Sequence, residues 1–153
     1  MLPAVFENWF RSKGWQPHPH QLEMLAAARG GRHSLLIAPT GGGKTLAGFL
    51  PSLAEIAETG HDCIHTIYIS PLKALAMDIH RNLELPLKEM GLEITLETRT
   101  GDTPANRRQR QRVNPPNLLL TTPESLALLV SYEDAGEIFG NLKCIVVDEA
   151  HAL

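Results

Sequence analysis

The feature that most constrains this chain is a run of glycines between a short apolar segment and a stretch of helix-forming residues. Residues 33–38 are rich in leucine and isoleucine and predict a short buried strand, and residues 44–58 predict a helix. The glycines between them let the backbone curl so that its N–H groups face inward, towards an anion at the start of the helix. The segment therefore predicts a phosphate-binding loop.

This loop matches the Walker A pattern, with Ala38 in a position often held by glycine. Lys44 adds a positive charge that can reach the β- and γ-phosphates, and the Thr45 hydroxyl is suited to coordinate Mg²⁺. A nucleoside triphosphate and Mg²⁺ are therefore the expected ligands. The residues expected to bind the nucleotide are Pro39, Thr40, Gly41, Gly42, Gly43, Lys44 and Thr45. The alternative is a glycine-rich turn beside an exposed lysine.

A pair of carboxylates follows another apolar segment, at residues 142–147. A carboxylate at the C-terminal end of a parallel strand faces the ligand crevice of an α/β sheet. We expect Asp148 to hold Mg²⁺ through water and Glu149 to polarise the water that attacks the γ-phosphate. Both carboxylates and Lys44 are thus candidate catalytic groups. The alternative is a solvated acidic turn.

The remaining pattern is an alternation of short apolar runs and helix-forming stretches, which predicts an α/β fold with a mainly parallel sheet covered on both faces. Further strands are expected at residues 64–70, 93–99 and 118–121, and further helices at 4–13, 21–29 and 73–90. Pro51 should kink the helix at 44–58. Residues 102–116 form the one polar stretch that we expect to be irregular.

The amino-acid composition excludes few classes of function. The net charge of −3 predicts no particular partner, and 43% hydrophobic residues is ordinary for a globular domain. No apolar run is long enough to span a membrane, and the first residues do not have the pattern of a signal peptide. Cys63 and Cys144 are expected to be reduced thiols, and His18 and His20 lack the spacing of a metal site. We therefore expect a cytoplasmic protein.

With both motifs identified, the chain resembles superfamily 2 helicases of the DExH type, and it is similar to them along nearly its whole length. Gln21, with Pro17 before it, resembles the Q motif, whose amide can donate to N7 and accept from N6 of adenine. The resemblance therefore implies ATP as the nucleotide. It also implies an aromatic ring near the base, for which Trp15 and Phe10 are both candidates. Alternatively, Gln21 is a polar residue at a helix start.

Three further segments resemble family motifs that line the track for one nucleic-acid strand: residues 70–75 resemble motif Ia, residues 100–102 the TGD element, and residues 121–126 motif Ib. Hydroxyl groups and N–H groups at helix starts can hold phosphates without reading bases. The resemblance implies nucleic-acid contacts at Pro71, Lys73, Gly101, Thr122, Pro123 and Glu124. Prolines at helix starts also have a purely structural explanation. The resemblance further implies that His151 couples the ATP site to the nucleic-acid track, a catalytic role.

Within the superfamily, these same segments are most similar to Lhr-type helicases, especially the ligase-associated DEXH-box branch. That resemblance implies an ATP-driven motor that moves 3′ to 5′ on single-stranded DNA, acts in DNA repair and associates with a DNA ligase. The alternatives are an RNA helicase, another superfamily 2 remodelling motor, or an inactive nucleotide-binding module. A small P-loop kinase is disfavoured because no lid segment is recognisable.

Two expectations concern what surrounds these motifs. The four arginines at 107, 108, 110 and 112 could contact phosphates or form a solvated helix face.

The resemblance also implies that residues 1–153 are the N-terminal part of a first RecA-like domain, truncated after motif II, with the required second RecA-like domain absent. The strand that carries motif III would lie between the loop strand and the strand before Asp148. We therefore expect a gap there, an unstable isolated chain and negligible helicase activity.

Overall fold

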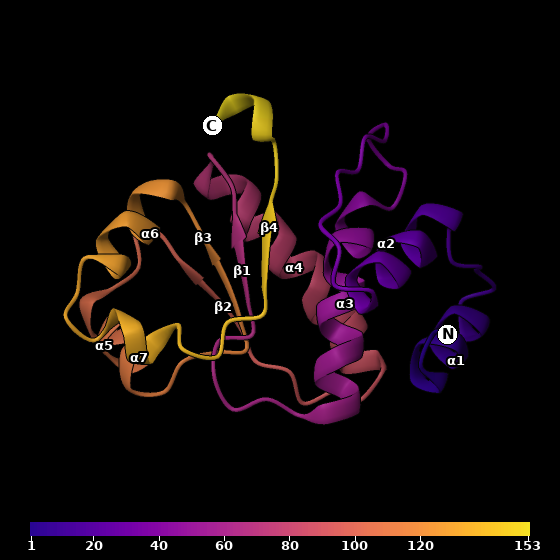
Figure 1. Ribbon diagram of the computed structural model, residues 1–153, viewed down its shortest axis with the longest axis horizontal. Helices are drawn as coiled ribbons and strands as arrows, with labels where there is room; N and C mark the ends of the chain where they lie inside the picture. The colour runs from indigo at the N-terminus through magenta and orange to yellow at the C-terminus, as the bar shows by residue number, and fades with distance from the viewer.

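The computed structural model describes residues 1–153, and at its centre is a four-stranded parallel sheet with the strand order β2-β3-β1-β4 (Figure 1). The strands are β1 (Thr66–Ile69), β2 (Leu96–Arg99), β3 (Leu118–Thr121) and β4 (Cys144–Val147). Each lies within a segment in which the sequence predicts a strand. The predicted α/β fold with a parallel sheet is therefore confirmed.

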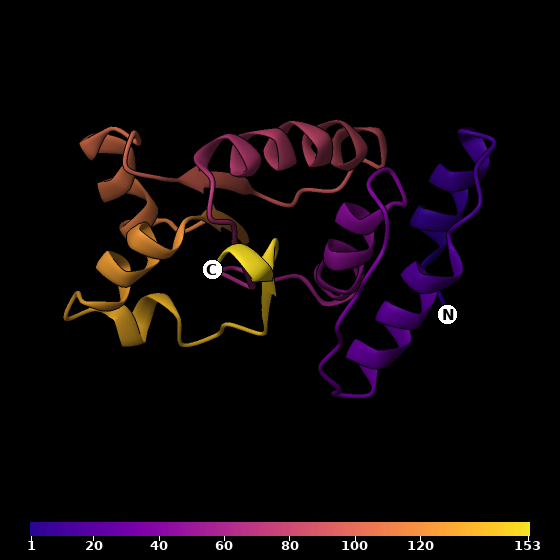
Figure 2. The same ribbon diagram turned by 90° about the horizontal axis from the view of Figure 1, so that it is seen from above.

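Helices cover both faces of this sheet (Figure 2). They are α1 (Ala4–Ser12), α2 (Pro19–Arg29), α3 (Lys44–Thr59), α4 (Lys73–Glu89), α5 (Ala105–Val113), α6 (Pro123–Val130) and α7 (Ala135–Ile138), with a short 3₁₀ helix η1 (Ala150–Ala152) at the end. None of them is long and apolar enough to span a membrane. Because helices connect the strands, the strands can run parallel and in the same register.

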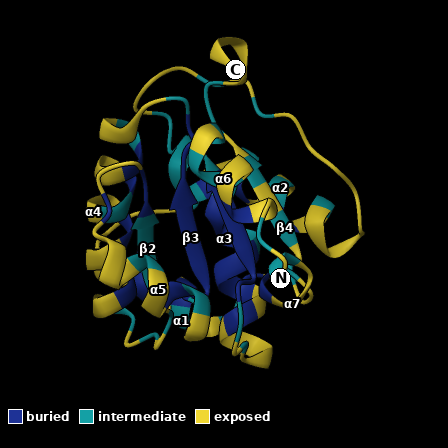
Figure 3. Ribbon diagram, turned by 90° about the vertical axis from the view of Figure 1, so that its left-hand side faces the viewer, coloured by how far each residue is buried: buried dark blue, intermediate teal, exposed yellow.

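Alternating side chains of the central strands pack into two separate apolar cores, one on each face of the sheet. Tyr68, Leu118 and Leu120 face a cluster of 17 buried residues that joins the sheet to α1, α2, α3 and α4. Ile67 and Leu119 face a smaller cluster of five, with partners on α6 and α7. Figure 3 shows the buried strand β3 between these layers. The continuous apolar runs in the sequence thus belong to strands that are covered on both faces.

The predicted strand at residues 33–38 is wrong. No backbone hydrogen bond involves this segment, and the side chains of Leu35 and Ile37 are 82% and 88% exposed. A strand is stabilised only by pairing with a neighbour. The outer edge of β4 is also unpaired, and Ile145 and Val147 on it are 56% and 48% exposed. The sequence predicts a gap between two strands, but because residues 33–38 form no strand, β4 is the edge of the sheet. The instability of the isolated chain stays a prediction.

The stretch at residues 102–116 is not irregular, since it contains α5. Arginine and glutamine are good helix formers, and several of the α5 side chains have partners elsewhere in the chain. In α3, the helix continues through Pro51 to Thr59. Helix α3 confirms the helix predicted at 44–58 to within one residue, and the kink at Pro51 stays a prediction. The predicted helices at 4–13, 21–29 and 73–90 are confirmed to within two residues.

Candidate functional site

The loops that carry the nucleic-acid motifs and the acidic pair follow the C-terminal ends of the four strands. In the shared register, Ile69 pairs with Thr121 and Val147, and Thr121 pairs with Arg99. The residues that follow these strand ends are Ser70, Thr100, Thr122 and Asp148. Ligands of open parallel sheets bind at the C-terminal ends of the strands. The structure therefore brings the three nucleic-acid motifs and the acidic pair together on one side of the domain.

The glycine-rich loop adopts a conformation that only glycine accommodates without strain. Gly41 and Gly43 have φ angles of 83° and 72°, in the left-handed region that disfavours other residues. A Cβ atom at Gly43 would lie 2.6 Å from Gln21 Nε2. Gly43 is thus required both by its backbone conformation and by the close approach of Gln21.

The loop presents unpaired N–H groups at the start of a long helix. The backbone N–H groups of Gly41, Gly43, Lys44 and Thr45 donate to no backbone acceptor, and α3 has no side-chain cap. Lys44 takes part in none of the ion pairs within the chain. Free N–H groups, the partial positive charge of a helix start and an unpaired lysine suit an anion. The residues present therefore fit a bound phosphate chain.

Gln21 connects the start of α2 to this loop. Its Nε2 donates to the Gly43 carbonyl oxygen at 3.2 Å, and its Oε1 accepts from the His18 N–H at 2.8 Å. The side chain is almost completely buried, at 2% exposure. Each polar atom keeps capacity for one more hydrogen bond. Gln21 thus anchors the loop in this structure, a role that its predicted recognition of adenine does not exclude.

The two aromatic candidates for the base differ in accessibility. The ring of Phe10 is buried in the larger core at 5% exposure, so it has no free face for a base. Trp15 is 57% exposed and packs edge-on against Trp9, with ring centroids 5.8 Å apart. Trp15 is therefore the candidate whose ring remains accessible.

The acidic pair at the end of β4 is held by short contacts. Asp148 accepts hydrogen bonds from the Tyr68 hydroxyl at 2.8 Å and from the Glu149 N–H at 2.9 Å. Burial, together with the contact to Asp148, raises the pKa of Tyr68, so the phenol stays a donor. Glu149 is the one non-glycine residue with a positive φ, at 49°. A conformation of this kind costs energy and is concentrated at functional sites.

Helix α3 packs against the strand that leads to this pair. A Cβ atom at Gly48 would lie 3.3 Å from Val146 Cγ1, so the first turns of α3 lie on β4. No cluster of three His, Cys, Asp or Glu side chains could hold a metal ion alone. The hydroxyl of Thr45 and the carboxylate of Asp148 are hard oxygen donors of the kind that Mg²⁺ prefers, with phosphate and water completing its shell. The donor set is consistent with a nucleotide-bound Mg²⁺.

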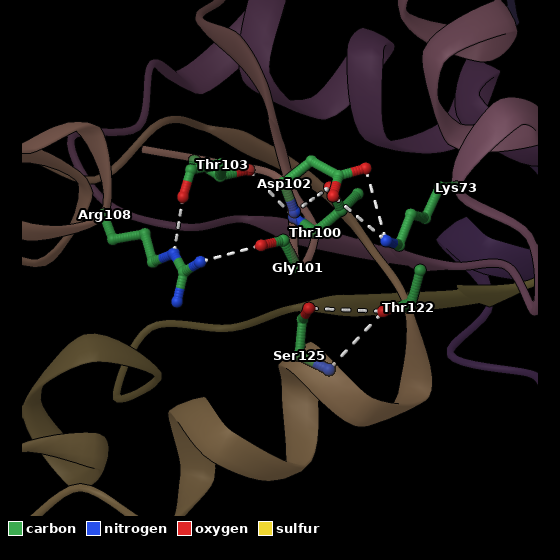
Figure 4. Close-up of polar contacts among 8 residues, drawn as sticks. All are labelled: Lys73, Thr100, Gly101, Asp102, Thr103, Arg108, Thr122 and Ser125. Carbon is green, nitrogen blue, oxygen red and sulfur yellow. Dashed lines mark hydrogen bonds and ion pairs between the residues drawn. The ribbon is translucent and has the colours of Figure 1, made fainter. Parts of the chain in front are cut away.

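The nucleic-acid motifs contact one another (Figure 4). Lys73, in the first turn of α4, lies 3.2 Å from both carboxylate oxygens of Asp102. Thr122 is the N-cap of α6, and its Oγ1 accepts from the Ser125 N–H at 3.4 Å. The hydroxyl of Thr121 donates to the Arg99 carbonyl oxygen at 2.7 Å, which joins the ends of β3 and β2. Pro71, Gly101, Pro123 and Glu124 lie in these same loops and helix starts.

Three features of the site were not predicted from the sequence. Tyr68 and Asp148 are 80 residues apart, and only the pairing of β1 with β4 brings them together. Arg99 is a buried arginine in a strand whose sequence alternates, and Arg108, which the sequence placed in a basic run, donates to the carbonyl oxygens of Thr103 and Gly101. His151, which the sequence suggested as a coupling residue, is 79% exposed and lies 3.2 Å from Glu149.

Comparison with known proteins agrees with these features. Residues 18–153 match the DEAD/DEAH box helicase family. The chain is 40% identical over 163 residues to the Lhr helicase/probable uracil glycosylase of Mycolicibacterium smegmatis, which covers 98% of this chain and 11% of that protein. It is 37% identical over 168 residues to the ATP-dependent helicase Lhr-Core of Methanocaldococcus jannaschii, which covers 100% of this chain and 20% of that protein. The chain thus spans a fifth or less of these relatives, and the resemblance to Lhr-type helicases is confirmed.

Solved structures give the same result. The structure of the Mycobacterium smegmatis helicase Lhr bound to ssDNA and AMP-PNP matches 99% of this chain and 21% of its own, with a TM-score of 0.89 and 40% identity. The helicase MrfA bound to DNA and AMPPNP matches 98% of this chain and 21% of its own, with a TM-score of 0.87 and 31% identity. The fold is therefore RecA-like, and the chain belongs to the DEAD/DEAH box helicase family.

Proposed function

We propose that this chain is the ATP-binding part of an ATP-dependent DNA helicase or translocase. The observation that carries the proposal is the set of unpaired N–H groups at Gly41, Gly43, Lys44 and Thr45, at the start of a helix that packs on the strand leading to Asp148. A phosphate chain is the ligand that such a loop suits. The acidic pair supplies the metal-binding and water-activating groups that hydrolysis of a phosphoanhydride needs.

In this proposal each residue has a definite task. Lys44 and the loop amides neutralise charge on the β- and γ-phosphates, which is the largest electrostatic contribution expected here. Thr45 and Asp148 would hold Mg²⁺, which would supply positive charge next to the phosphates. Glu149 accepts the proton of the attacking water, and Tyr68 keeps the Asp148 carboxylate in one orientation. Gln21 contributes adenine recognition through its remaining donor and acceptor.

The nucleic-acid partner follows from the motif loops and the relatives together. Lys73, Gly101 and the start of α6 at Thr122, Pro123 and Glu124 offer a cation, a small residue and helix N–H groups, which hold a sugar–phosphate backbone without reading bases. The two solved relatives were bound to ssDNA and to DNA. We therefore favour single-stranded DNA over RNA as the track. Movement 3′ to 5′, a role in DNA repair and association with a DNA ligase stay predictions from the family resemblance.

The proposal also concerns the rest of the motor. Residues 1–153 are proposed to form the N-terminal part of a first RecA-like domain, and function is proposed to require a second RecA-like domain that closes on the nucleotide. Such a partner domain contributes an arginine finger, which is worth about 10³–10⁵ in rate. His151 is proposed to couple the ATP site to the nucleic-acid track. A cytoplasmic location stays a prediction.

The test is ATP hydrolysis by the intact protein with the variant Lys44→Ala. We expect at least a hundredfold loss of single-stranded-DNA-stimulated hydrolysis, since Lys44 contacts the reacting phosphates. Lys88→Ala is the matched control, because Lys88 is an exposed lysine of α4 without a partner, and it should hydrolyse ATP as the wild type does. Stimulation by RNA but not by DNA would favour an RNA helicase. Undiminished hydrolysis by Lys44→Ala would remove the proposal.

A further inference from the structure

The loop that follows β2 is held closed by hydrogen bonds within four residues. The Thr100 N–H donates to the Thr103 hydroxyl at 2.9 Å, and the Thr103 N–H donates to the Thr100 carbonyl oxygen at 3.1 Å. The Asp102 N–H donates to the Thr100 hydroxyl at 3.3 Å. These contacts set the turn, and they leave the carbonyl oxygens of Gly101 and Thr103 pointing away from it, towards α5 (Figure 4).

Arg108 of α5 binds both of these carbonyl oxygens. Its Nε donates to the Thr103 oxygen at 2.7 Å, and its Nη2 donates to the Gly101 oxygen at 2.9 Å (Figure 4). A planar guanidinium can satisfy two acceptors at once in a fixed geometry, whereas an ammonium group is a single point of charge. Arg108 therefore joins the two ends of the loop, and lysine could not reproduce the arrangement.

A second arginine, Arg99, binds the backbone of Arg108. Arg99, at the end of β2, is only 2% exposed, and its Nη1 donates to the Arg108 carbonyl oxygen at 3.1 Å and to Gln111 Oε1 at 3.5 Å. The Gln111 amide in turn donates to the Thr98 carbonyl oxygen at 3.0 Å. No carboxylate takes part in these contacts. The buried arginine thus fixes α5 to β2, and it fixes the backbone from which Arg108 reaches the loop.

The other arginines of α5 are used differently. Arg110 pairs with Glu97. Arg112 pairs with Asp134 at 2.9 Å and lies over the ring of Tyr132, 4.2 Å from its centroid. Arg107 is exposed, and its side chain has no partner. The basic run is therefore not a uniform phosphate-binding face, and Arg108 is the member committed to the Thr100–Thr103 loop.

We propose that Arg108 is a positioning residue of the nucleic-acid interface: it shapes the Thr100–Thr103 loop from the carbonyl side, so that Gly101 and the Lys73–Asp102 pair face the phosphate backbone. Arg108 itself contacts no phosphate. This inference rests on the proposed function, because it assigns the loop to a nucleic-acid track. It predicts that the geometry of the Arg108 side chain matters and that its charge alone does not.

The experiment compares two charge-conserving variants, Arg108→Lys and Arg107→Lys, in the intact protein, with binding of an oligothymidylate single strand measured by fluorescence anisotropy over a range of salt concentrations. We expect Arg108→Lys to bind about tenfold more weakly, equivalent to ~1.4 kcal/mol, with an unchanged salt slope. Arg107→Lys should bind as the wild type does. Arg108→Gln should behave as Arg108→Lys, with no fall in slope.

A phosphate contact would give a different pattern. It would be retained by Arg108→Lys, and its loss in Arg108→Gln would lower the salt slope by about 0.7 for a single strand. That pattern would overturn the inference while the proposed function stands. Absence of oligothymidylate binding by the wild type would overturn the proposed function itself. If circular dichroism shows that Arg108→Gln has lost its fold, amide hydrogen exchange of Arg108→Lys decides: faster exchange at Thr100 and Thr103 supports the inference, and unchanged exchange contradicts it.

Discussion

The Tyr68 hydroxyl donates a 2.8 Å hydrogen bond to Asp148 Oδ2 across the boundary between two paired strands. The ring of Tyr68 is buried at 2% exposure and stacks on Phe49, with ring centroids 5.4 Å apart. A carboxylate that is to hold Mg²⁺ needs a fixed orientation, and residues around metal ligands supply it. The buried phenol therefore links the sheet core to the acidic pair.

Removing this hydroxyl with Tyr68→Phe should reduce ATP hydrolysis by the intact protein. The ring packing is retained, so the expected cost in stability is only about 1 kcal/mol for the lost hydrogen bond. The maximal rate should fall about three- to tenfold, since Asp148 loses its orienting donor, with a smaller change in the KM for ATP. Steady-state kinetics over a series of Mg²⁺ concentrations measures both. A rate equal to that of the wild type would show that the phenol does not position Asp148.

Gly43→Ala should abolish nucleotide binding. The substitution combines a φ angle of 72° with a Cβ position 2.6 Å from Gln21 Nε2, so the loop or Gln21 has to move. Gly91→Ala is the matched control, because Gly91 has a φ of 65° but no atom within 4 Å of the added Cβ. Both should lose about 1–2 kcal/mol of unfolding free energy, and only Gly43→Ala should lose affinity for a fluorescent ATP analogue. Equal affinities would contradict the close contact.

Asp102→Asn should tighten binding of single-stranded DNA. Lys73 lies 3.2 Å from Asp102, and both side chains are largely exposed, so the pair is worth at most about 1 kcal/mol. Without the carboxylate, Lys73 is free to meet a phosphate, and affinity should rise two- to fivefold at low salt. Anisotropy titrations of an oligothymidylate measure this. Weaker binding would mean that Asp102 holds Lys73 in its productive position.

The stability of the domain should fall in mild acid because of His65. Burial, partly offset by Glu55 and reinforced by His61 and Lys143, lowers the pKa of His65 below its usual value of 6.5. The unfolded chain therefore takes up a proton near pH 6.5, before the folded chain does. Unfolding free energy should decrease as pH falls from 6.5 towards the folded-state pKa, and no such loss should occur above pH 6.5.

Thermal melts of the wild type and His65→Gln between pH 5 and pH 8 measure this effect. The difference in melting temperature between the two should shrink as the pH falls below 6.5, because only the wild type carries the penalty. A difference that stays constant over the whole range would show that His65 does not titrate between the folded and unfolded states.

The parts of the site that depend on local order could be predicted from the sequence. The phosphate loop is a run of adjacent residues between Ala38 and Thr45, and Asp148 and Glu149 follow directly after an apolar strand. The apolar run at Leu118–Thr121 likewise has one explanation, a strand buried on both faces. Local composition is enough to predict these features, although a predicted strand forms only where a neighbouring strand pairs with it.

The predictions that were wrong or missing concern features that depend on elements distant in the sequence and adjacent in space. Residues 33–38 have the composition of a strand, but a strand needs a partner, and the segment has none in this structure. Helix α5 has few apolar residues, and it is held by arginine contacts to carbonyl oxygens rather than by an apolar face. The contact from Tyr68 to Asp148 required the β1–β4 pairing. None of these could be derived from the order of residues alone.

The most direct test of the central claim is a calorimetric titration of a non-hydrolysable ATP analogue into the intact protein, with and without Mg²⁺. The loop and Lys44 are proposed to bind phosphates, and Asp148 to act through the metal. Lys44→Ala should therefore lose binding in both conditions, whereas Asp148→Asn should bind as the wild type does without Mg²⁺ and about tenfold more weakly with it. If Asp148→Asn binds the analogue as tightly as the wild type does in the presence of Mg²⁺ as well, the carboxylate is not across the metal from the phosphate loop, and the account is contradicted.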